Sequence, residues 1–332
     1  MNIISVKNNL GIPKYKQIII SVENALQEGS LKKGDKLPSI NSIRNKFSLS
    51  RDTVLKAYSE LKLRGIIQSI SGKGYYIKSE NVSVKQNIFL LFDELNSFKE
   101  DLYNSFLNNL DDNTQVDIFF HHFNFTVFSK LINDSIGNYS SYVIMPANFH
   151  NSQNIIKNLP EEKVYILDQI HNDIAHYSAI YQNFENAIYN NLNAIYKQLT
   201  KYHKITLLFQ ENKQPKGMLL GFEKFCQKNN FKSEVINSIE HITPKTSDIF
   251  LIPDDKNLIL LIKKIKEENL KIGENIGVIS YNDSLLKEIV EGGITTISTD
   301  FNKMGKTLAQ MILNKENIQI ENPTTLTFRK SI

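Results

Sequence analysis

Short, nearly continuous apolar runs, each followed by a helical or polar stretch, recur along the chain after residue 87. Runs of this kind are typical of parallel strands that are buried on both faces, and their alternation with helices predicts a doubly wound α/β domain. About 245 residues are many for one such sheet, so we expect two lobes. The runs lie at residues 88–92, 116–121, 142–146, 164–168, 205–209, 249–252 and 276–281.

Polar side chains stand where several of these runs end. Asp168 ends one run, Asp254 closely follows another, and Asn282 comes directly after a third. In open α/β sheets ligands bind beyond the carboxyl ends of the strands, so these residues are candidate ligand contacts. An Asp after a strand also often caps the next helix, so Asp283 and Asp300 are candidates for a helix cap alone as well as for a ligand contact.

The first 80 residues show helical spacing instead. We expect a helix over 14–28 that Gly29 ends, because apolar residues recur there every three or four positions after Pro13. Ser39 and Ser50 can each cap a further helix, and Gly65 can end the last one. The pattern predicts a helix-turn-helix.

Two β-prone runs, 66–69 and 75–78, follow these helices and are separated by Ser71-Gly72-Lys73-Gly74. The glycines stand where a hairpin turn needs positive φ, so we expect a hairpin, or wing. Residues 79–87 lack periodicity and are the expected linker. The predicted domains are 1–78 for the winged helix, 79–87 for the linker and 88–332 for the two-lobed domain.

Charge is unevenly distributed along the chain. Residues 1–79 hold 14 Lys and Arg against 5 Asp and Glu, a net charge of +9, whereas residues 80–332 hold 25 against 30, a net charge of −5. Excess positive charge in one small domain is typical of binding to a phosphate backbone, although a solvated basic surface has the same composition. Charge therefore favours DNA as a partner without establishing it.

Residues 13–77 resemble the GntR-type winged helix. The matching positions include Tyr15, Gln17, Leu37-Pro38-Ser39, Ser50-Arg51 and Thr53-Val54, together with the wing glycines. The resemblance implies that the third helix enters the major groove and that the wing tip meets the minor groove. The DNA-binding residues expected from it are Ser39, Asn41, Ser50, Arg51, Thr53, Lys56, Gly72, Lys73 and Gly74.

Asn41 departs from the family pattern, which usually has Arg at this position. We expect a guanine or phosphate contact there to be weakened or replaced by an amide contact. Arg51 retains a guanidinium fork that matches guanine edges or phosphate. Ser39 and Ser50 would cap helices in any protein.

The C-terminal part of the chain resembles the effector domain of LacI-type repressors, which is built like the periplasmic sugar-binding proteins. The motifs that carry the resemblance are Tyr281-Asn282-Asp283, Thr295-Thr296-Ile297, Met304-Gly305, Pro323 and Phe328-Arg329-Lys330-Ser331. A GntR-type head on such a domain is similar to a group of monosaccharide-responsive regulators, including fucose regulators of the Bacteroidetes. The expected fold is a winged helix-turn-helix followed by a two-lobed, periplasmic-binding-protein-like α/β domain with parallel doubly wound sheets.

By position, the resemblance implies that Asp168, Asp254 and Asn282 hydrogen-bond sugar hydroxyls, with Tyr281 and Phe301 nearby. Carboxylates accept bonds from hydroxyls, amides donate and accept, and aromatic rings cover the apolar side of a sugar ring. We expect a ligand that touches both lobes to favour closure of the domain.

One charged contact of the LacI pattern is missing. Met218 stands where that family commonly has an arginine, three residues before its glycine-aromatic pair. Lys213 and Lys216 on the same loop are candidate substitutes for that contact.

Other kinds of site have weaker support. The sequence contains no GxxxxGK[ST], HExxH or GxSxG motif, and the single cysteine, Cys226, cannot form an intrachain disulfide. The histidines 121, 122, 171 and 176 have no cysteine or carboxylate cluster at ligand spacing. We expect no metal, no cofactor and no catalytic residue.

The function expected from the sequence is a ligand-responsive transcription factor that binds a palindromic operator as a homodimer in the cytoplasm, with no membrane association. Two alternatives stay open. One is a small-molecule binding protein whose DNA head has lost specific binding. The other is a fusion enzyme with a pyridoxal phosphate domain, which would need a longer downstream fold and a cofactor lysine motif.

Overall fold

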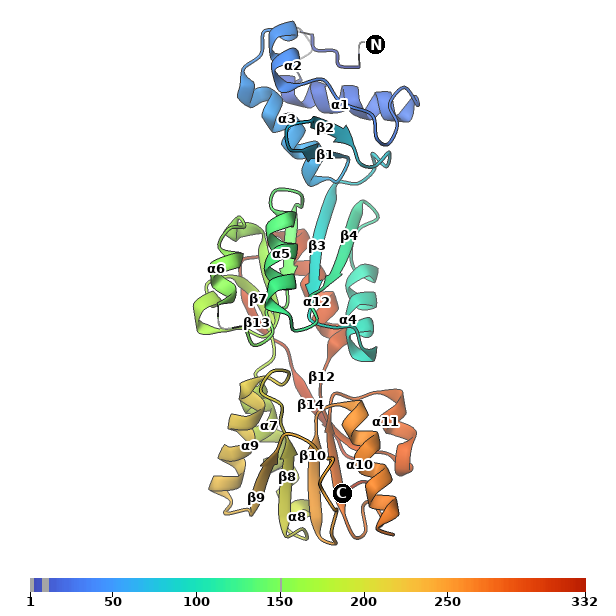
Figure 1. Ribbon diagram of the computed structural model, residues 1–332, viewed down its shortest axis with the longest axis vertical. Helices are drawn as coiled ribbons and strands as arrows, with labels where there is room; N and C mark the ends of the chain where they lie inside the picture. The colour runs from blue at the N-terminus through green and yellow to red at the C-terminus, as the bar shows by residue number, and fades with distance from the viewer. Residues whose placement is uncertain (1–2, 8–11, 150) are drawn as a thin grey trace. The chain divides into compact units, whose positions relative to one another are not determined.

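The computed structural model describes residues 3–7, 12–149 and 151–332 of the chain (Figure 1). Two compact units are formed, and each is described by itself. The first comprises Met1–Phe92, Leu110–Ile144 and Gln153–Tyr165, and the second comprises Asp93–Asn109, Met145–Ser152 and Ile166–Ile332.

The first unit begins with a winged helix, as the sequence predicts. Three helices precede an antiparallel hairpin in which Ile67 pairs with Ile77 and Ile70 with Gly74. Gly72 and Gly74 have φ angles of +69° and +110°, which residues with a side chain rarely adopt. The elements are α1 (Lys14–Gln27), α2 (Ile40–Phe47), α3 (Arg51–Leu63), β1 (Ile67–Ile70) and β2 (Gly74–Ile77).

Helices α1 and α3 pack their apolar faces together in the core of the winged helix. Ile18, Val22, Val54 and Tyr58 are fully buried there. The hydroxyl of Tyr58 donates a 2.7 Å hydrogen bond to the carbonyl of Pro38, which satisfies the one polar atom of this buried ring. Helices α1 and α3 thus share one apolar core.

A six-stranded sheet follows the winged helix, with strand order β13-β7-β6-β5-β3-β4. The pairs β3 with β4, β3 with β5, and β13 with β7 are parallel. The strands are β3 (Gln86–Phe92), β4 (Thr114–Phe120), β5 (Ser141–Ile144), β6 (Val164–Asp168), β7 (Ser178–Tyr181) and β13 (Gln319–Glu321). The intervening helices are α4 (Ser97–Asn108), α5 (Phe125–Ser135), α6 (Ser152–Ile156), η1 (Glu161–Lys163) and η2 (Asn172–Ile174).

The second six-stranded sheet has the order β14-β12-β11-β10-β8-β9, and within it only β14 is antiparallel to its neighbour. Its strands are β8 (Lys204–Leu208), β9 (Ser233–Ile236), β10 (Asp248–Ile252), β11 (Gly277–Tyr281), β12 (Thr295–Thr299) and β14 (Thr324–Thr327). Its helices are α7 (Phe184–Ala194), α8 (Tyr196–Leu199), α9 (Lys216–Lys228), α10 (Asp255–Glu267), α11 (Leu285–Ile289) and η3 (Val290–Gly292). The two sheets of doubly wound type confirm the predicted fold class.

The chain passes between the two sheets three times: after β7, after β12 and after β13. After the second passage it forms α12 (Phe301–Asn314), which packs against α4. The approach is close at Gly305, where an added Cβ would overlap the carbonyl oxygen of Leu102. A residue larger than glycine at this position would push the two helices apart.

Candidate nucleic-acid interface and ligand site

The start of α3 carries the residues that the sequence assigns to DNA. The Ser50 hydroxyl caps the helix by accepting a 3.1 Å hydrogen bond from the Thr53 backbone amide, and it lies 2.8 Å from the Thr53 hydroxyl, with which it also bonds. Arg51 is exposed and makes no side-chain hydrogen bond or ion pair with any described residue. Its guanidinium is therefore available to an external partner.

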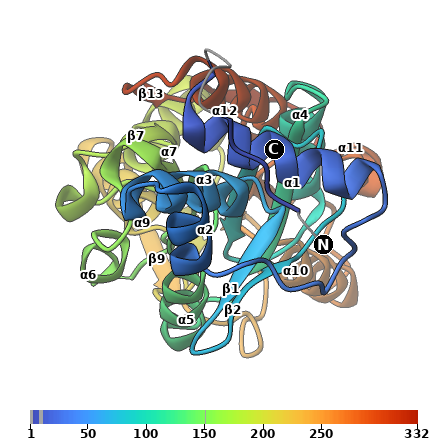
Figure 2. The same cartoon turned by 90° about the horizontal axis from the view of Figure 1, so that it is seen from above.

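Figure 2 shows α1, α2 and α3 of the winged helix together with its hairpin strands β1 and β2. The remaining predicted DNA residues are also exposed. The Ser39 hydroxyl caps α2 by accepting from the Ser42 amide, and Asn41 is exposed in the first turn of that helix. Lys56 is exposed with its ammonium 4.3 Å from the ring centroid of Tyr15. The wing tip at Gly72, Lys73 and Gly74 is exposed as well.

Arg64 contributes to the basic charge of the head but is 7% exposed. Its guanidinium donates to the backbone carbonyls of Val82 and Val84 at 2.9 and 2.7 Å and pairs with Glu23 at 2.5 Å. It therefore holds the segment after the wing and is not available to DNA. Its sequence position, just before Gly65, gives no signal of this role.

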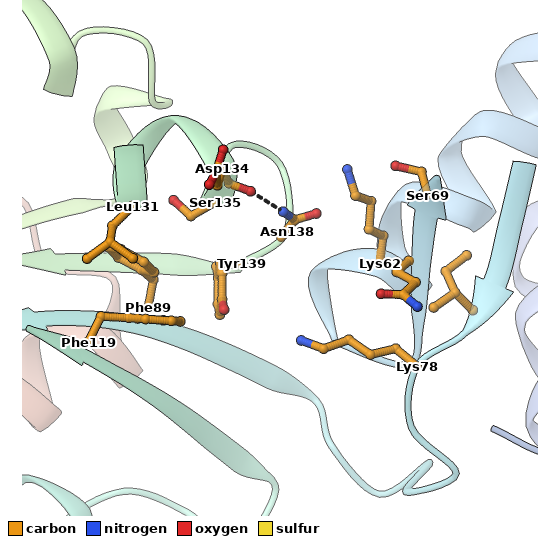
Figure 3. A pocket seen from close by; sticks show the side chains of 12 residues that line it. Lys62, Ser69, Lys78, Phe89, Phe119, Leu131, Asp134, Ser135, Asn138 and Tyr139 are labelled. Atoms are coloured by element: carbon orange, nitrogen blue, oxygen red, sulfur yellow. Dashed lines mark hydrogen bonds between the residues drawn. The ribbon is translucent and has the colours of Figure 1, made fainter. Parts of the chain in front are cut away.

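A cavity of about 340 Å³ lies in the first unit (Figure 3). Lys62 and Lys78 come from the winged helix, and Phe89, Phe119 and Tyr139 come from the elements that follow it. The Lys78 ammonium lies 3.7 Å from a carboxylate oxygen of Asp117, and that same oxygen accepts a 2.9 Å bond from the Tyr139 hydroxyl. None of the residues predicted to contact DNA or a ligand lines this cavity.

Asp168, at the end of β6, lies in the second unit. It is 9% exposed and has a φ of +75°, an unusual conformation for a residue with a side chain. Its carboxylate accepts a 2.5 Å hydrogen bond from the Gln182 amide, and burial raises its pKa to about 6. Gln182 in turn accepts a 3.0 Å bond from the Tyr281 hydroxyl. One amide thus connects the ends of β6 and β11.

A buried ion pair lies close to Asp168. Lys99 of α4 is 6% exposed and Asp93, just after β3, is 4% exposed, and their side chains form a salt bridge. The Lys99 charge lowers the pKa of Asp168 and the Asp93 charge raises it, so both act on that carboxyl group. The sequence did not identify Asp93, Lys99 or Gln182.

Asn282, directly after β11, is 9% exposed with a φ of +60°. Its backbone N–H donates to the carbonyl of Ile297 at 2.8 Å, and its backbone carbonyl accepts from the Lys287 ammonium at 2.6 Å. The side-chain Oδ1 is buried without a hydrogen-bond partner among the described residues. A buried acceptor without a partner costs about 1 to 3 kcal/mol, and such groups in strained backbone cluster at binding sites.

Asp254 has a different environment. It is half-buried at the start of α10, where one carboxylate oxygen accepts from the Asn257 amide at 2.9 Å and the other accepts from the Asn257 side chain at 2.8 Å. Asp300 caps α12 in the same way, through the Lys303 amide at 2.8 Å. Asp283 forms two 2.8 Å bonds with Arg329.

The aromatic and basic candidates are also placed. Tyr281 is 3% exposed, and Phe301 is 7% exposed and stacks on Phe98 with ring centroids 5.0 Å apart. Lys213 and Lys216 are both exposed. Met218, at the position of the missing arginine, is buried in the apolar core of the second sheet.

Asn322 links all three connections between the sheets. It is 2% exposed, and its backbone amide donates to the carbonyl of Tyr181 at 2.7 Å. Its side-chain amide donates to the Thr299 hydroxyl at 2.8 Å and to the Asp300 carbonyl at 2.9 Å. Each of the three connections therefore contributes at least one residue to this group of hydrogen bonds.

Comparison with known proteins identifies both parts of the chain. Residues 14–77 match the bacterial regulatory proteins of the gntR family, and residues 200–332 match the periplasmic binding protein-like domain. We call the first part the GntR-type head after this match and the second the LacI-like domain, because its fold resembles that of the Lac repressor. None of the helices in the described part of the chain is both long and apolar enough to span a bilayer.

Curated relatives match the GntR-type head. The HTH-type transcriptional repressor YtrA of Bacillus subtilis is 44% identical over 69 residues, which is 21% of this chain and 52% of YtrA. The mannosyl-D-glycerate transport/metabolism system repressor MngR of Escherichia coli is 38% identical over 90 residues, 27% of this chain and 35% of MngR. The chain thus spans about a third to a half of the length of these relatives.

Solved structures match the LacI-like domain in fold. A dimeric Lac repressor with an 11-residue C-terminal deletion covers 74% of this chain with 98% of its own length, at a TM-score of 0.64 and 16% identity. The trehalose repressor from Escherichia coli covers 73% of this chain with 99% of its own length, at a TM-score of 0.62 and 14% identity.

Proposed function

We propose that this protein is a transcriptional regulator that binds operator DNA through its GntR-type head and responds to a small molecule bound by its LacI-like domain. The observation that carries the proposal is the winged helix with Arg51 exposed and unpaired at the start of its third helix. In this proposal residues 1–78 form the DNA-binding domain, residues 79–87 the linker and residues 88–332 the effector-binding domain. The protein acts in the cytoplasm and has no catalytic activity.

The DNA interface consists of the start of α3, the start of α2 and the wing tip. Arg51 reads a base or clamps a phosphate, while Ser39 and Ser50 hold the helix starts against the backbone. A head with a net charge of +9 releases counterions when it neutralises phosphates, so affinity falls steeply as salt rises. Asn41 weakens or changes one contact and so alters the operator sequence.

The effector is a monosaccharide or a derivative, such as fucose, and it contacts Asp168 and Asn282. The support is chemical, because both side chains accept hydrogen bonds from hydroxyls and the Asn282 Oδ1 lacks a partner. The names of relatives also refer to sugars. One of them is the arabinose metabolism transcriptional repressor of Geobacillus stearothermophilus, which is 35% identical over 66 residues, 20% of this chain and 18% of that protein.

The functional form is a homodimer on a palindromic operator. One recognition helix covers a half-site, and useful specificity in a genome needs two half-sites. The dimeric Lac repressor of similar fold supports this arrangement. Sedimentation of the protein with and without operator DNA tests it, and a monomer in both samples would contradict it.

Arg51→Ala tests the DNA interface. We expect it to weaken operator binding by about 1 to 3 kcal/mol and to relax discrimination at one operator position if Arg51 reads a base. Fluorescence anisotropy over a salt series measures both effects. Lys224→Ala, an exposed lysine of α9, is the control and should leave binding unchanged.

Uniform weakening across DNA sequences would make Arg51 a phosphate contact. Wild-type affinity that does not depend on salt would contradict DNA binding itself. It would favour a small-molecule binding protein with a degenerate head, the alternative that Asn41 supports.

A further inference from the structure

We infer that the LacI-like domain binds an uncharged polyhydroxyl compound and discriminates against sugar phosphates and sugar acids. The inference rests on the proposed function, because it concerns the ligand of the same site. It follows from the charges of the buried side chains around Asp168 and from the kind of hydrogen-bond partner that they lack.

The buried charges near Asp168 sum to one negative charge. Lys99 forms a salt bridge with Asp93, so its positive charge is already neutralised. The hydrogen-bond partner of Asp168 is the neutral amide of Gln182. With a pKa of about 6, Asp168 is mostly ionised at pH 7.5. An anionic group placed beside it would meet a carboxylate in a medium that screens charge poorly.

The side-chain oxygens that a ligand could contact at these two strand ends are acceptors. Asn282 Oδ1 is buried without a partner, and the carboxylate of Asp168 can only accept. Hydroxyl groups supply the donors that both need, whereas phosphate and carboxylate oxygens supply only further acceptors. The need for hydroxyl donors and the negative charge near Asp168 therefore both favour an uncharged ligand with hydroxyl groups.

The buried cations beyond Lys99 are also paired. The Lys287 ammonium donates to the carbonyls of Tyr281 and Asn282 and lies 2.9 Å from Asp255. Two of its donors are therefore used by backbone carbonyls, and its charge is paired with that of Asp255. Arg329 is occupied by two bonds to Asp283.

The candidate cations that stay exposed are Lys213 and Lys216, on the loop before α9 and at its first residue. If the ligand were anionic, these two lysines would have to hold it. The competing hypothesis is therefore an anionic ligand held by Lys213 and Lys216. A variant that lacks both lysines distinguishes this hypothesis from the inference.

The test uses the full-length protein and matched ligand pairs. Isothermal titration calorimetry compares arabinose, fucose, glucose, mannose, galactose, lactose and trehalose with glucose 6-phosphate, mannose 6-phosphate, trehalose 6-phosphate, glucuronate and galacturonate. We expect at least one neutral compound to bind, and charged partners of neutral ligands to bind about 100-fold more weakly because like charges meet in a buried site. Equal or tighter binding of a charged compound overturns the inference, and so does the absence of binding by every neutral compound at millimolar concentration.

Two variants identify the source of the discrimination. Asp168→Asn removes the negative charge and keeps the shape, so the ratio between neutral and charged ligands should fall at least about 10-fold. Should this variant bind nothing, the wild-type ratio decides alone. Replacing Lys213 and Lys216 together by alanine should leave the ratio unchanged, and loss of anion binding in that variant would overturn the inference.

Operator binding is also measured without ligand on the same preparations. This measurement tests the proposed function separately from the inference about the ligand. A charged compound that binds and changes operator affinity would overturn the inference and leave the proposed function intact. Failure to bind any DNA would contradict the proposed function without altering the ligand ratios.

Discussion

Asp168 at the end of β6 and Asp254 shortly after β10 occupy similar positions in the sequence, and the structure gives them different surroundings. Asp168 is buried, has a left-handed φ and is bonded by one neutral amide. Asp254 is half-buried and uses both carboxylate oxygens on Asn257 at the start of a helix. Position at a strand end identifies candidate residues, whereas burial and partners distinguish a candidate binding group from a helix cap.

The two environments also differ in energy. The helix cap is a favourable arrangement, because the carboxylate satisfies an amide that would otherwise lack a partner. The surroundings of Asp168 are unfavourable for the isolated protein, since they combine a buried charge with strained backbone. Such groups persist where the surrounding structure holds them, which is common at binding sites.

The largest effect is expected from breaking the ion pair beside Asp168. Lys99→Met leaves Asp93 and Asp168 as two buried carboxylates without a cation, and we expect it to lower the free energy of unfolding by about 3 to 5 kcal/mol. Urea denaturation monitored by circular dichroism measures the change.

Two controls sharpen this prediction. The double variant Asp93→Asn with Lys99→Met removes the unpaired charge of Asp93 and should recover part of the loss. Lys224→Ala breaks the exposed pair with Glu185 and should change stability by less than about 1 kcal/mol. Equal effects of Lys99→Met and Lys224→Ala would contradict the burial argument.

The next effect concerns pH. Burial raises the pKa of Asp168 from 3.8 to about 6, so between these values the folded state binds more protons than the unfolded state. Stability contributed by this group therefore falls as pH rises from about 4 to about 6, by about 3 kcal/mol in total, and is constant above that range. Urea denaturation at a series of pH values follows it.

Asp168→Asn is the matched variant, because an amide does not titrate in this range. Subtracting its pH profile from that of the wild type isolates the contribution of Asp168 from those of the other carboxylates. A difference that does not change between pH 4 and pH 6 would show that the carboxyl group titrates as it does in water.

Most central strands of both sheets and the edge strand β4 could be predicted from the sequence, whereas the edge strands β9 and β13 could not. All seven predicted runs lie on strands, with bounds that differ by a few residues. The edge strands β9 and β13 were missed because most of their residues are exposed, so they lack the apolar run that marks a buried strand. The winged helix was predicted element by element, since its caps and turn glycines are local signals.

The candidate ligand site could be predicted only where its residues lie at the ends of predicted strands. Asp168 and Asn282 were proposed as candidates in this way, but Gln182 follows β7, a strand whose four residues gave no clear signal. Lys99 lies on a helix and forms its ion pair with a residue six positions earlier. The sequence does not distinguish a buried lysine from an exposed one, so only the folded structure shows that Lys99 is paired inside the protein.

The smallest effect tests the other half of the comparison. Asp254→Ala removes the cap of α10, and we expect the free energy of unfolding to fall by about 1 kcal/mol, because the Asn257 amide loses its partner. Asp254→Ser can still cap the helix and should recover most of this loss.

If Asp254 acts as a cap alone, both variants keep the wild-type affinity for whichever neutral sugar binds, as measured by calorimetry. If Asp254 instead bonds sugar hydroxyls, as its position in the LacI pattern implies, both variants lose affinity by about 1 to 3 kcal/mol while stability separates them. That second outcome would place Asp254 with Asp168 and remove the distinction between the two strand ends.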